Sequence, residues 1–141
     1  MRILVDTNVV LDVALERRPF LRNSEQVLAY VEQGTVEGYI SASTFTDLYY
    51  VIRKARGKEW ALGFLSQLLT FFQIATVDQG VIVHALQSRF EDLEDSVQYE
   101  TAIANQLQSI VTRNPEDFPN HRLEIFTPES LIQQLSGRKL P

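Results

Sequence analysis

Four aspartates stand where a carboxylate is costly, just after apolar segments or on the helices expected to follow them. They are Asp6, Asp47, Asp95 and Asp117, in the segments VDTN, TFTDLYY, LEDSVQY and VTRNPEDF. A carboxylate beside an apolar core needs a compensating partner. Because the four occur in comparable positions along the chain, we expect one shared partner, a divalent metal ion. Hard carboxylate oxygens prefer Mg²⁺ or Mn²⁺.

The composition indicates a folded domain and argues against several other kinds of site. The chain has 141 residues, of which 45% are hydrophobic, so we expect a single domain over residues 1–141. It contains no cysteine, which excludes disulfides, thiolate zinc sites and a cysteine nucleophile. The two histidines, His84 and His121, share no motif with a serine, which argues against a Ser-His-Asp triad.

The net charge and the length of the apolar segments indicate which functions and locations are disfavoured. The formal net charge is −5, which argues mildly against a protein that coats nucleic acid. It leaves a nuclease open, because bound cations reverse the local sign of an acidic site. The first apolar run stops at Asp6, so it is no signal peptide, and none is long enough for a membrane span. We expect a soluble, cytoplasmic protein without membrane contact.

Strands and helices are predicted to alternate along the chain. The apolar runs predict strands at residues 2–5, 38–40, 74–75, 109–111 and 123–126. Helical spacing and cap residues predict helices at about 8–15, from Asn23 to 32, after Ser43, at 60–71, from Asp78 to about Phe90, at 95–107, and from Thr127-Pro128 onward. This alternation predicts an α/β sandwich with a mostly parallel sheet, in which ligands gather at the carboxyl ends of the strands.

Four segments together carry a family resemblance. They are the opening ILVDTN, then SASTFTDLYY (41–50), LEDSVQYETA (93–102) and SIVTRNPEDF (109–118). In this order and at this spacing they resemble the PIN domain, the fold of many RNA-cutting nucleases and of VapC-type toxins. The resemblance implies a three-layer α/β/α sandwich. It also implies a metal-dependent endoribonuclease that leaves a 5′-phosphate and a 3′-hydroxyl.

The same resemblance assigns the acidic positions of the site. The first and third fall on Asp6 and Asp95, which we expect to be the primary metal ligands. The second is usually glutamate, and here it is Asp47, one methylene shorter, which completes the ligand set or positions the attacking water. For the fourth position, Asn114 and Asp117 both remain open.

Polar neighbours are expected to support these acids. Asn8, Thr112 and Asn114 match positions where the family places polar side chains, and we expect them to fix the carboxylate rotamers. The resemblance further implies Mg²⁺ or Mn²⁺ as cofactor, RNA as substrate, an antitoxin protein as a possible partner, and a homodimer. The apolar helices between Asn23 and Phe71 offer surface for that dimer.

Simpler interpretations stay open for the single positions. Asp6 and Asp95 suit helix caps, Asp47 suits a solvated helix face, and Asp117 suits a turn. Glu91, Asp92 and Glu94 suit a solvated acidic turn, with Asp92 the exception most worth testing. Asp12 suits either the cleft or solvent, and Arg113 suits either RNA phosphate or water.

Two other functions are weighed against the nuclease. One is a PIN-fold module that binds RNA or protein with weak catalysis, which the shortened Asp47 and the acidic surface favour. The other is a phosphotransfer domain. Dehalogenase-like phosphatases need a second aspartate two residues after the first, where this chain has Asn8, so that reading is disfavoured.

Overall fold

Five strands form one sheet in the computed structural model, which describes residues 1–88, 91–119 and 122–137. Their order across the sheet is β3-β2-β1-β4-β5, and every pairing among them is parallel, as predicted. The strands are β1 (Arg2–Val5), β2 (Glu37–Ser41), β3 (Phe72–Ala75), β4 (Ser109–Val111) and β5 (Glu124–Phe126). His121 and Phe90 lie outside the described residues.

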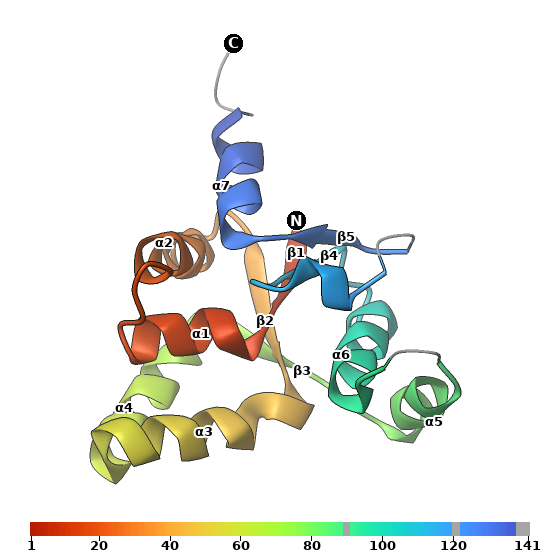
Figure 1. The fold of residues 1–141 in the computed structure, drawn as a ribbon, viewed down its shortest axis with the longest axis horizontal. Coiled ribbons are helices and arrows are strands. Elements are labelled where there is room, and N and C mark those ends of the chain that lie inside the picture. Colours follow the sequence, from red (N-terminus) through yellow and green to blue (C-terminus); the bar gives the residue numbers. More distant parts are fainter. Residues whose placement is uncertain (89–90, 120–121, 138–141) are drawn as a thin grey trace.

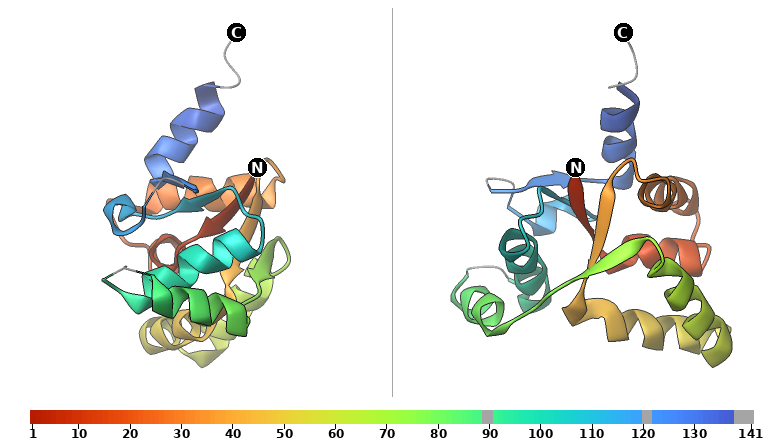
Figure 2. Two further views of the ribbon diagram at one scale, coloured as in Figure 1. Left: turned by 90° about the vertical axis from the view of Figure 1, so that its right-hand side faces the viewer. Right: turned by 180° about the vertical axis from the view of Figure 1, so that it is seen from behind.

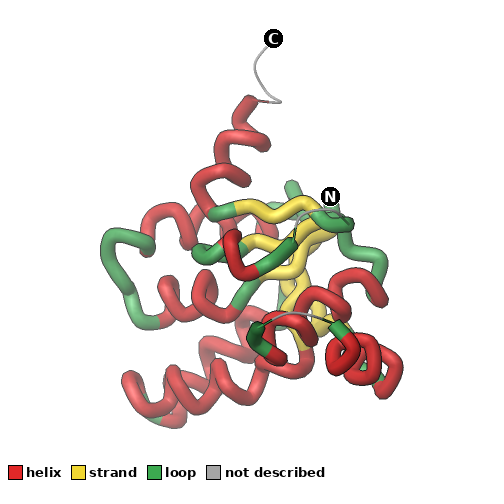
Figure 3. Tube along the Cα trace, turned by 45° about the vertical axis from the view of Figure 1, so that its right-hand side comes forward, coloured by secondary structure: helices red, strands yellow, loops and turns green. Residues whose placement is uncertain are grey.

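Helices cover both faces of this sheet, which confirms the predicted α/β/α sandwich (Figure 1). The tube in Figure 3 shows the strands enclosed between the two groups of helices. The helices are α1 (Thr7–Ala14), α2 (Leu21–Glu32), α3 (Ala42–Arg56), α4 (Lys58–Leu68), α5 (Gln79–Gln87), α6 (Leu93–Ala104) and α7 (Pro128–Gly137). No helix in these ranges combines the length and the apolar character that crossing a membrane requires.

Alternate residues of each strand feed two separate cores. Ile3 and Val5 of β1 pack with α1, α2, α3, α4 and α7 on one face. Leu4 packs with α6 on the other face, beside Tyr99 and Ala102. Figure 2 shows these two groups of helices on opposite sides of the strands. Burial on both faces explains why the strand is continuously apolar rather than alternating.

The chain changes direction across the sheet between β1 and β4. From β1 it proceeds to β2 and β3 on one side, and then returns to place β4 and β5 on the other side. Val5 pairs with Val111, so the residues that follow these two strands, Asp6 and Thr112, are neighbours. Ligand sites of open parallel sheets lie at such a switch point, outside the carboxyl ends of the strands.

The helix starts agree with the sequence at some caps and differ at others. Asp78 and Thr127 accept backbone N–H bonds at the starts of α5 and α7, as predicted. Ser41 caps α3 in place of Ser43, because its hydroxyl accepts the Ser43 N–H at 3.2 Å. The predicted cap at Asn23 is wrong, because α2 begins two residues earlier and Asn23 lies inside its first turn.

Candidate metal centre at the carboxyl edge of the sheet

Asp6 is a buried carboxylate at the switch point, with 7% of its surface exposed. It caps α1, because its Oδ1 accepts the Thr7 N–H at 2.7 Å. The side-chain amide of Gln98 also donates to Oδ1, at 3.0 Å, and the hydroxyl of Thr112 donates to Oδ2, at 2.8 Å. An ionised carboxylate has about four acceptor directions. These bonds therefore fix its rotamer and leave Oδ2 with capacity for another ligand.

The loop after β4 is built around Thr112, which is fully buried. Its Oγ1 accepts the backbone N–H of Asn114 at 3.1 Å while its proton goes to Asp6. Asn8 reaches the same loop, where its Oδ1 accepts the Arg113 N–H at 3.4 Å. Asn8 therefore contacts the loop backbone rather than a carboxylate, and the side chain of Asn114 is exposed.

Asp95 lies in the first turn of α6 and is half-buried. The cap of this helix is Asp92, whose Oδ1 accepts the Asp95 N–H at 3.1 Å. The interpretation of Asp95 as the helix cap is therefore wrong. Asp92 is exposed, as a solvated turn predicts, but it is also the cap of α6. Burial raises the pKa of Asp95 to about 7, and the nearby charges of Asp92, Asp6, Asp117 and Glu94 add to the rise. Asp6 and Asp95 thus share one electrostatic environment.

Asp47 and Asp117 complete the acidic edge from the outside. Asp47 lies in the second turn of α3, and Asp117 ends the short 3₁₀ helix Pro115–Asp117 that follows β4. Both side chains are exposed. The charge of Asp117 acts on Asp95, and that of Asp47 acts on Glu94. The structure therefore brings all four predicted aspartates to one edge of the sheet.

Glu94 is an acid of this edge that the sequence did not single out. It is exposed, as a solvated turn predicts, but desolvation and the charges of Asp47, Asp92 and Asp6 raise its pKa. Its position directly before Asp95 was the available signal.

Gln98 is the second residue that sequence reasoning missed. It is 1% exposed and lies one helical turn after Asp95, on α6. Its amide nitrogen donates to Asp6, while its Oε1 has no hydrogen-bond partner among the described residues. The sequence carried one signal of this role, since Gln98 stands between the apolar residues Val97 and Tyr99. A buried amide usually has a hydrogen-bond partner, so a glutamine in such a position indicates a polar contact inside the protein.

Asp12 faces neither the cleft nor solvent. It is fully buried, and its Oδ2 lies 2.8 Å from Nε of Arg113. The hydroxyl of Ser24 donates to the same oxygen at 3.0 Å. The guanidinium of Arg113 also lies over the ring of Phe20, 4.0 Å from its centroid. Arg113 is therefore an internally compensated cation and not a free phosphate ligand.

The acidic edge suits a hard divalent cation in its chemistry. Its donors are carboxylate oxygens, and burial together with the neighbouring negative charges raises the pKa of Asp95 and of Glu94, a cost that a bound cation would relieve. In the described part of the chain, no three acidic or histidine side chains are arranged to hold a metal as they stand. Mg²⁺ commonly keeps several waters and binds through one or two carboxylates, so the donor set fits that ion without a cage.

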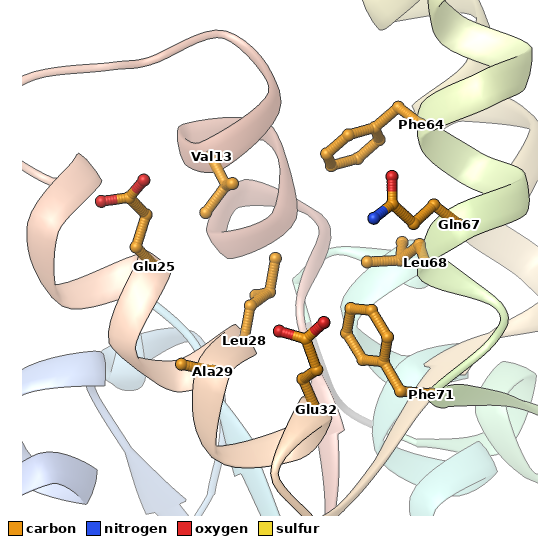
Figure 4. Close-up of a pocket in the computed structure, with 9 residues that line it drawn as sticks. All are labelled: Val13, Glu25, Leu28, Ala29, Glu32, Phe64, Gln67, Leu68 and Phe71. Atoms are coloured by element: carbon orange, nitrogen blue, oxygen red, sulfur yellow. The ribbon is translucent and has the colours of Figure 1, made fainter.

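An apolar hollow lies away from the acidic edge, between α1, α2 and α4. It encloses about 410 Å³. Figure 4 shows apolar side chains facing one another across it, among them Val13, Leu28, Phe64 and Phe71. Two acids, Glu25 and Glu32, stand along its α2 side. This hollow offers apolar contact surface and an acidic rim.

Comparisons with known proteins agree with this geometry. The family model of the PIN domain matches residues 2–116. Ribonuclease VapC1 of Aquifex aeolicus (strain VF5) is 26% identical over 138 residues, which cover 94% of each chain. A toxin–antitoxin complex from Klebsiella pneumoniae superposes with a TM-score of 0.68 at 24% identity, covering 89% of this chain and 97% of that one.

A third similarity concerns a toxin with a stated target. The structure of Mycobacterium tuberculosis VapC20, a toxin that cleaves the sarcin-ricin loop, superposes with a TM-score of 0.62 at 12% identity. The match covers 77% of this chain and 86% of that one. The sheet order, the acidic edge and the family match over most of the sequence lead to one conclusion: the chain belongs to the PIN domain family.

Proposed function

We propose that this protein is a Mg²⁺- or Mn²⁺-dependent endoribonuclease that acts as a VapC-type toxin. The observation that carries the proposal is the hydrogen bond from Gln98 of α6 to Asp6 at the end of β1, one helical turn from Asp95. The charge of Asp6 also helps to raise the pKa of Asp95. The curated relative that spans nearly the whole chain is a ribonuclease, which supports RNA as the substrate. RNA as substrate also supports a cytoplasmic location.

Asp6, Asp95 and Asp47 would hold the cation. When bound, a divalent ion supplies an activated water and neutralises charge on the scissile phosphate. Thr112 and Gln98 keep the Asp6 carboxylate in one orientation, so little reorganisation is needed when substrate arrives. Asp117, on the 3₁₀ helix beside Asp95, adds negative charge that attracts the cation.

A second acid, Glu94, would compensate for the short side chain of Asp47. The family usually has glutamate at the position of Asp47, so this chain is one methylene short on α3. Glu94 has the longer side chain and comes from α6, and its charge is coupled to Asp47 and to Asp6. We infer that the two act as a pair, with Asp47 binding the cation and Glu94 binding a water of its shell.

RNA cleavage by purified variants tests the function. The wild-type protein, incubated with structured RNA and Mn²⁺, is expected to cut it, and EDTA is expected to abolish cutting. Asp6→Asn and Asp95→Asn should each lower the rate at least about a hundredfold, since each removes a ligand charge. Asp78→Asn is the matched control, because Asp78 caps α5 and asparagine caps equally well. Activity that survives both site substitutions would rule out this assignment.

A binding module remains the second candidate, because Asp47 replaces the longer acid and the net charge is negative. Isothermal titration with Mn²⁺ separates the two. A nuclease should bind Mn²⁺ and lose that binding in Asp6→Asn. A module should bind RNA or a protein without detectable metal uptake.

We propose an antitoxin protein as the partner, since a structural neighbour is a toxin–antitoxin complex. The hollow between α1, α2 and α4 suits an apolar helix that carries basic residues, because Glu25 and Glu32 line its α2 side (Figure 4). Leu28→Glu should abolish capture of a co-expressed antitoxin. Leu62→Glu, at a 43% exposed leucine on α4 outside the hollow, should not. Because Leu28 is only 8% exposed, circular dichroism must show that Leu28→Glu is folded, and loss of capture by an unfolded variant would not count.

We also propose a homodimer. Exposed apolar side chains supply surface for it, namely Tyr50 and Val51 on α3, at 61% and 39% exposure, and Leu62 on α4, at 43%. Light scattering on the purified protein measures its mass. A mass of one chain at tens of micromolar would contradict the dimer.

A further inference from the structure

A second hollow lies beside the loop that follows β4, two residues of which, Arg113 and Asn114, line it. It encloses about 460 Å³, and its lining includes Phe20, Asn23, Arg113, Asn114 and Glu129. Asn114 connects it to the metal centre, because its N–H donates to the Thr112 hydroxyl that donates in turn to Asp6. A group bound in the hollow would therefore lie close to a phosphate held at the acidic edge.

Two planar groups that line the hollow, the guanidinium of Arg113 and the ring of Phe20, stack on each other. The guanidinium of Arg113 lies 4.0 Å from the centroid of the Phe20 ring. The fully buried Asp12, to which Ser24 donates a hydrogen bond, forms an ion pair with that guanidinium, with 2.8 Å between Oδ2 of Asp12 and Nε of Arg113. Planar groups fixed in this way require no ordering when a flat ligand stacks against them. Phe20 remains 41% exposed, so it is accessible to such a ligand.

The charges of the hollow favour a neutral ligand over a phosphate. Asp12 compensates the positive charge of Arg113, and Glu129 adds a negative charge to the lining of the hollow. An anion would find no net attraction there. The exposed side chains of Asn23 and Asn114 offer amide donors and acceptors, which suit the edge of a flat heterocycle.

We propose that this hollow is the subsite for one nucleobase of the RNA, next to the bond that is cut. Single-stranded RNA is recognised by stacking of splayed bases on aromatic and guanidinium planes and by hydrogen bonds to base edges. Phe20 and Arg113 provide the stacking planes, while Asn23, Asn114 and Glu129 provide the edge contacts. The subsite gives the enzyme a base preference at one nucleotide beside the cut. The inference rests on the proposed nuclease function.

Cleavage of a randomised RNA pool tests the subsite by its effect on base preference. The wild-type protein should prefer particular bases at one position beside the cut. Phe20→Leu, which keeps apolar volume but removes the aromatic plane, and Asn23→Ala should flatten that preference and raise KM on the order of tenfold. Gln134→Ala, an exposed amide on α7 outside the hollow, should leave both unchanged. An unchanged preference in both subsite variants would overturn the proposal.

Nucleotide binding tests the subsite independently of catalysis. AMP, CMP, GMP and UMP are titrated into metal-free wild-type protein while the side-chain amide NMR signals of Asn23 and Asn114 are followed. Shifts of both signals that differ among the four bases support the subsite, even if the protein cuts no RNA and the nuclease proposal fails. RNA cleavage with no base-dependent shift at Asn23 overturns the subsite and leaves the nuclease standing.

Discussion

The side-chain amide of Gln98 donates a hydrogen bond to Oδ1 of Asp6 at 3.0 Å, across 92 positions of sequence. This bond joins α6 to the end of β1. Asp95 lies one turn earlier on the same helix, so the bond also sets where Asp95 stands relative to Asp6. The geometry of the acidic edge therefore depends on a residue that carries no charge.

Gln98→Leu is expected to separate positioning from stability. Leucine has a similar volume, and it removes both the donor to Asp6 and the buried Oε1 that has no hydrogen-bond partner among the described residues. The free energy of unfolding should change by no more than about 1 kcal/mol, because Asp6 Oδ1 keeps the Thr7 N–H as a donor and the removal of the unpaired Oε1 offsets the lost bond. Mn²⁺ affinity should fall roughly tenfold or more, as for other lost supports of a metal ligand.

Denaturant unfolding and Mn²⁺ calorimetry on the same Gln98→Leu sample check this. A large loss of stability with unchanged Mn²⁺ affinity would assign Gln98 a purely structural role.

Thr112→Val should weaken the fold as well as the site. Valine keeps the shape but loses the hydroxyl that donates to Asp6 and accepts from the Asn114 N–H. Leaving buried groups unpaired costs about 1–3 kcal/mol in the free energy of unfolding. Thr112→Ser restores the hydroxyl and should recover both stability and RNA cleavage. Equal behaviour of the serine and valine variants would contradict the assigned contacts.

The stability of the metal-free protein should depend on pH through Asp95. Its pKa rises from 3.8 to about 7 on folding, so the folded state binds this proton more tightly than the unfolded state. The resulting penalty is absent below pH 4, grows between about pH 4 and 7, and is complete above pH 7. Glu94 acts in the same direction. After discounting for solvent screening, we expect about 1–2 kcal/mol.

Thermal unfolding of Asp95→Asn from pH 4 to 8 measures this effect. The substitution should raise the melting temperature at pH 8 and have little effect at pH 4. If Asp95→Asn raised the melting temperature equally at pH 4 and at pH 8, the stabilisation would not come from removing the ionised Asp95 carboxylate. Mn²⁺ should stabilise the wild-type protein more at pH 8 than at pH 5, because protons compete with the cation at Asp95.

Asp12→Asn should destabilise the protein by about 2–4 kcal/mol, because it leaves the guanidinium of Arg113 without its buried counter-charge. The double variant Asp12→Leu with Arg113→Met removes both charges and should recover much of the loss. Equilibrium unfolding in urea measures both. If Asp12→Asn unfolds like the wild-type protein, the ion pair contributes nothing to the fold.

The sheet and the aspartates were predictable from sequence for a physical reason. Buried parallel strands are continuously apolar, as in Ile3 to Val5, and the polar residue that ends such a strand lies at the sheet edge. Asp6 and Thr112 each end a strand, so their meeting followed from the alternation of strands and helices. The positions of the outer acids Asp47 and Asp117 beside apolar segments made them candidates, and the family resemblance supplied their expected roles.

Residues whose role depends on side-chain direction could not be placed from sequence. Gln98 and Asp12 lie on helices, and helical spacing alone does not say which neighbour from a distant segment each one meets. Asp12 meets Arg113, and Gln98 meets Asp6. The start of α2 was missed for a related reason. Asn23 is a good cap residue, but packing of Leu21 into the core starts the helix before it.

Anomalous diffraction from a crystal soaked in Mn²⁺ shows whether the acidic edge binds a cation. We expect an anomalous peak within ligand distance of a carboxylate oxygen of Asp6 and one of Asp95, and its loss in Asp6→Asn crystals. A well-diffracting crystal with no peak at this edge, or with Mn²⁺ bound only elsewhere, would contradict the claim that these acids gather a catalytic cation.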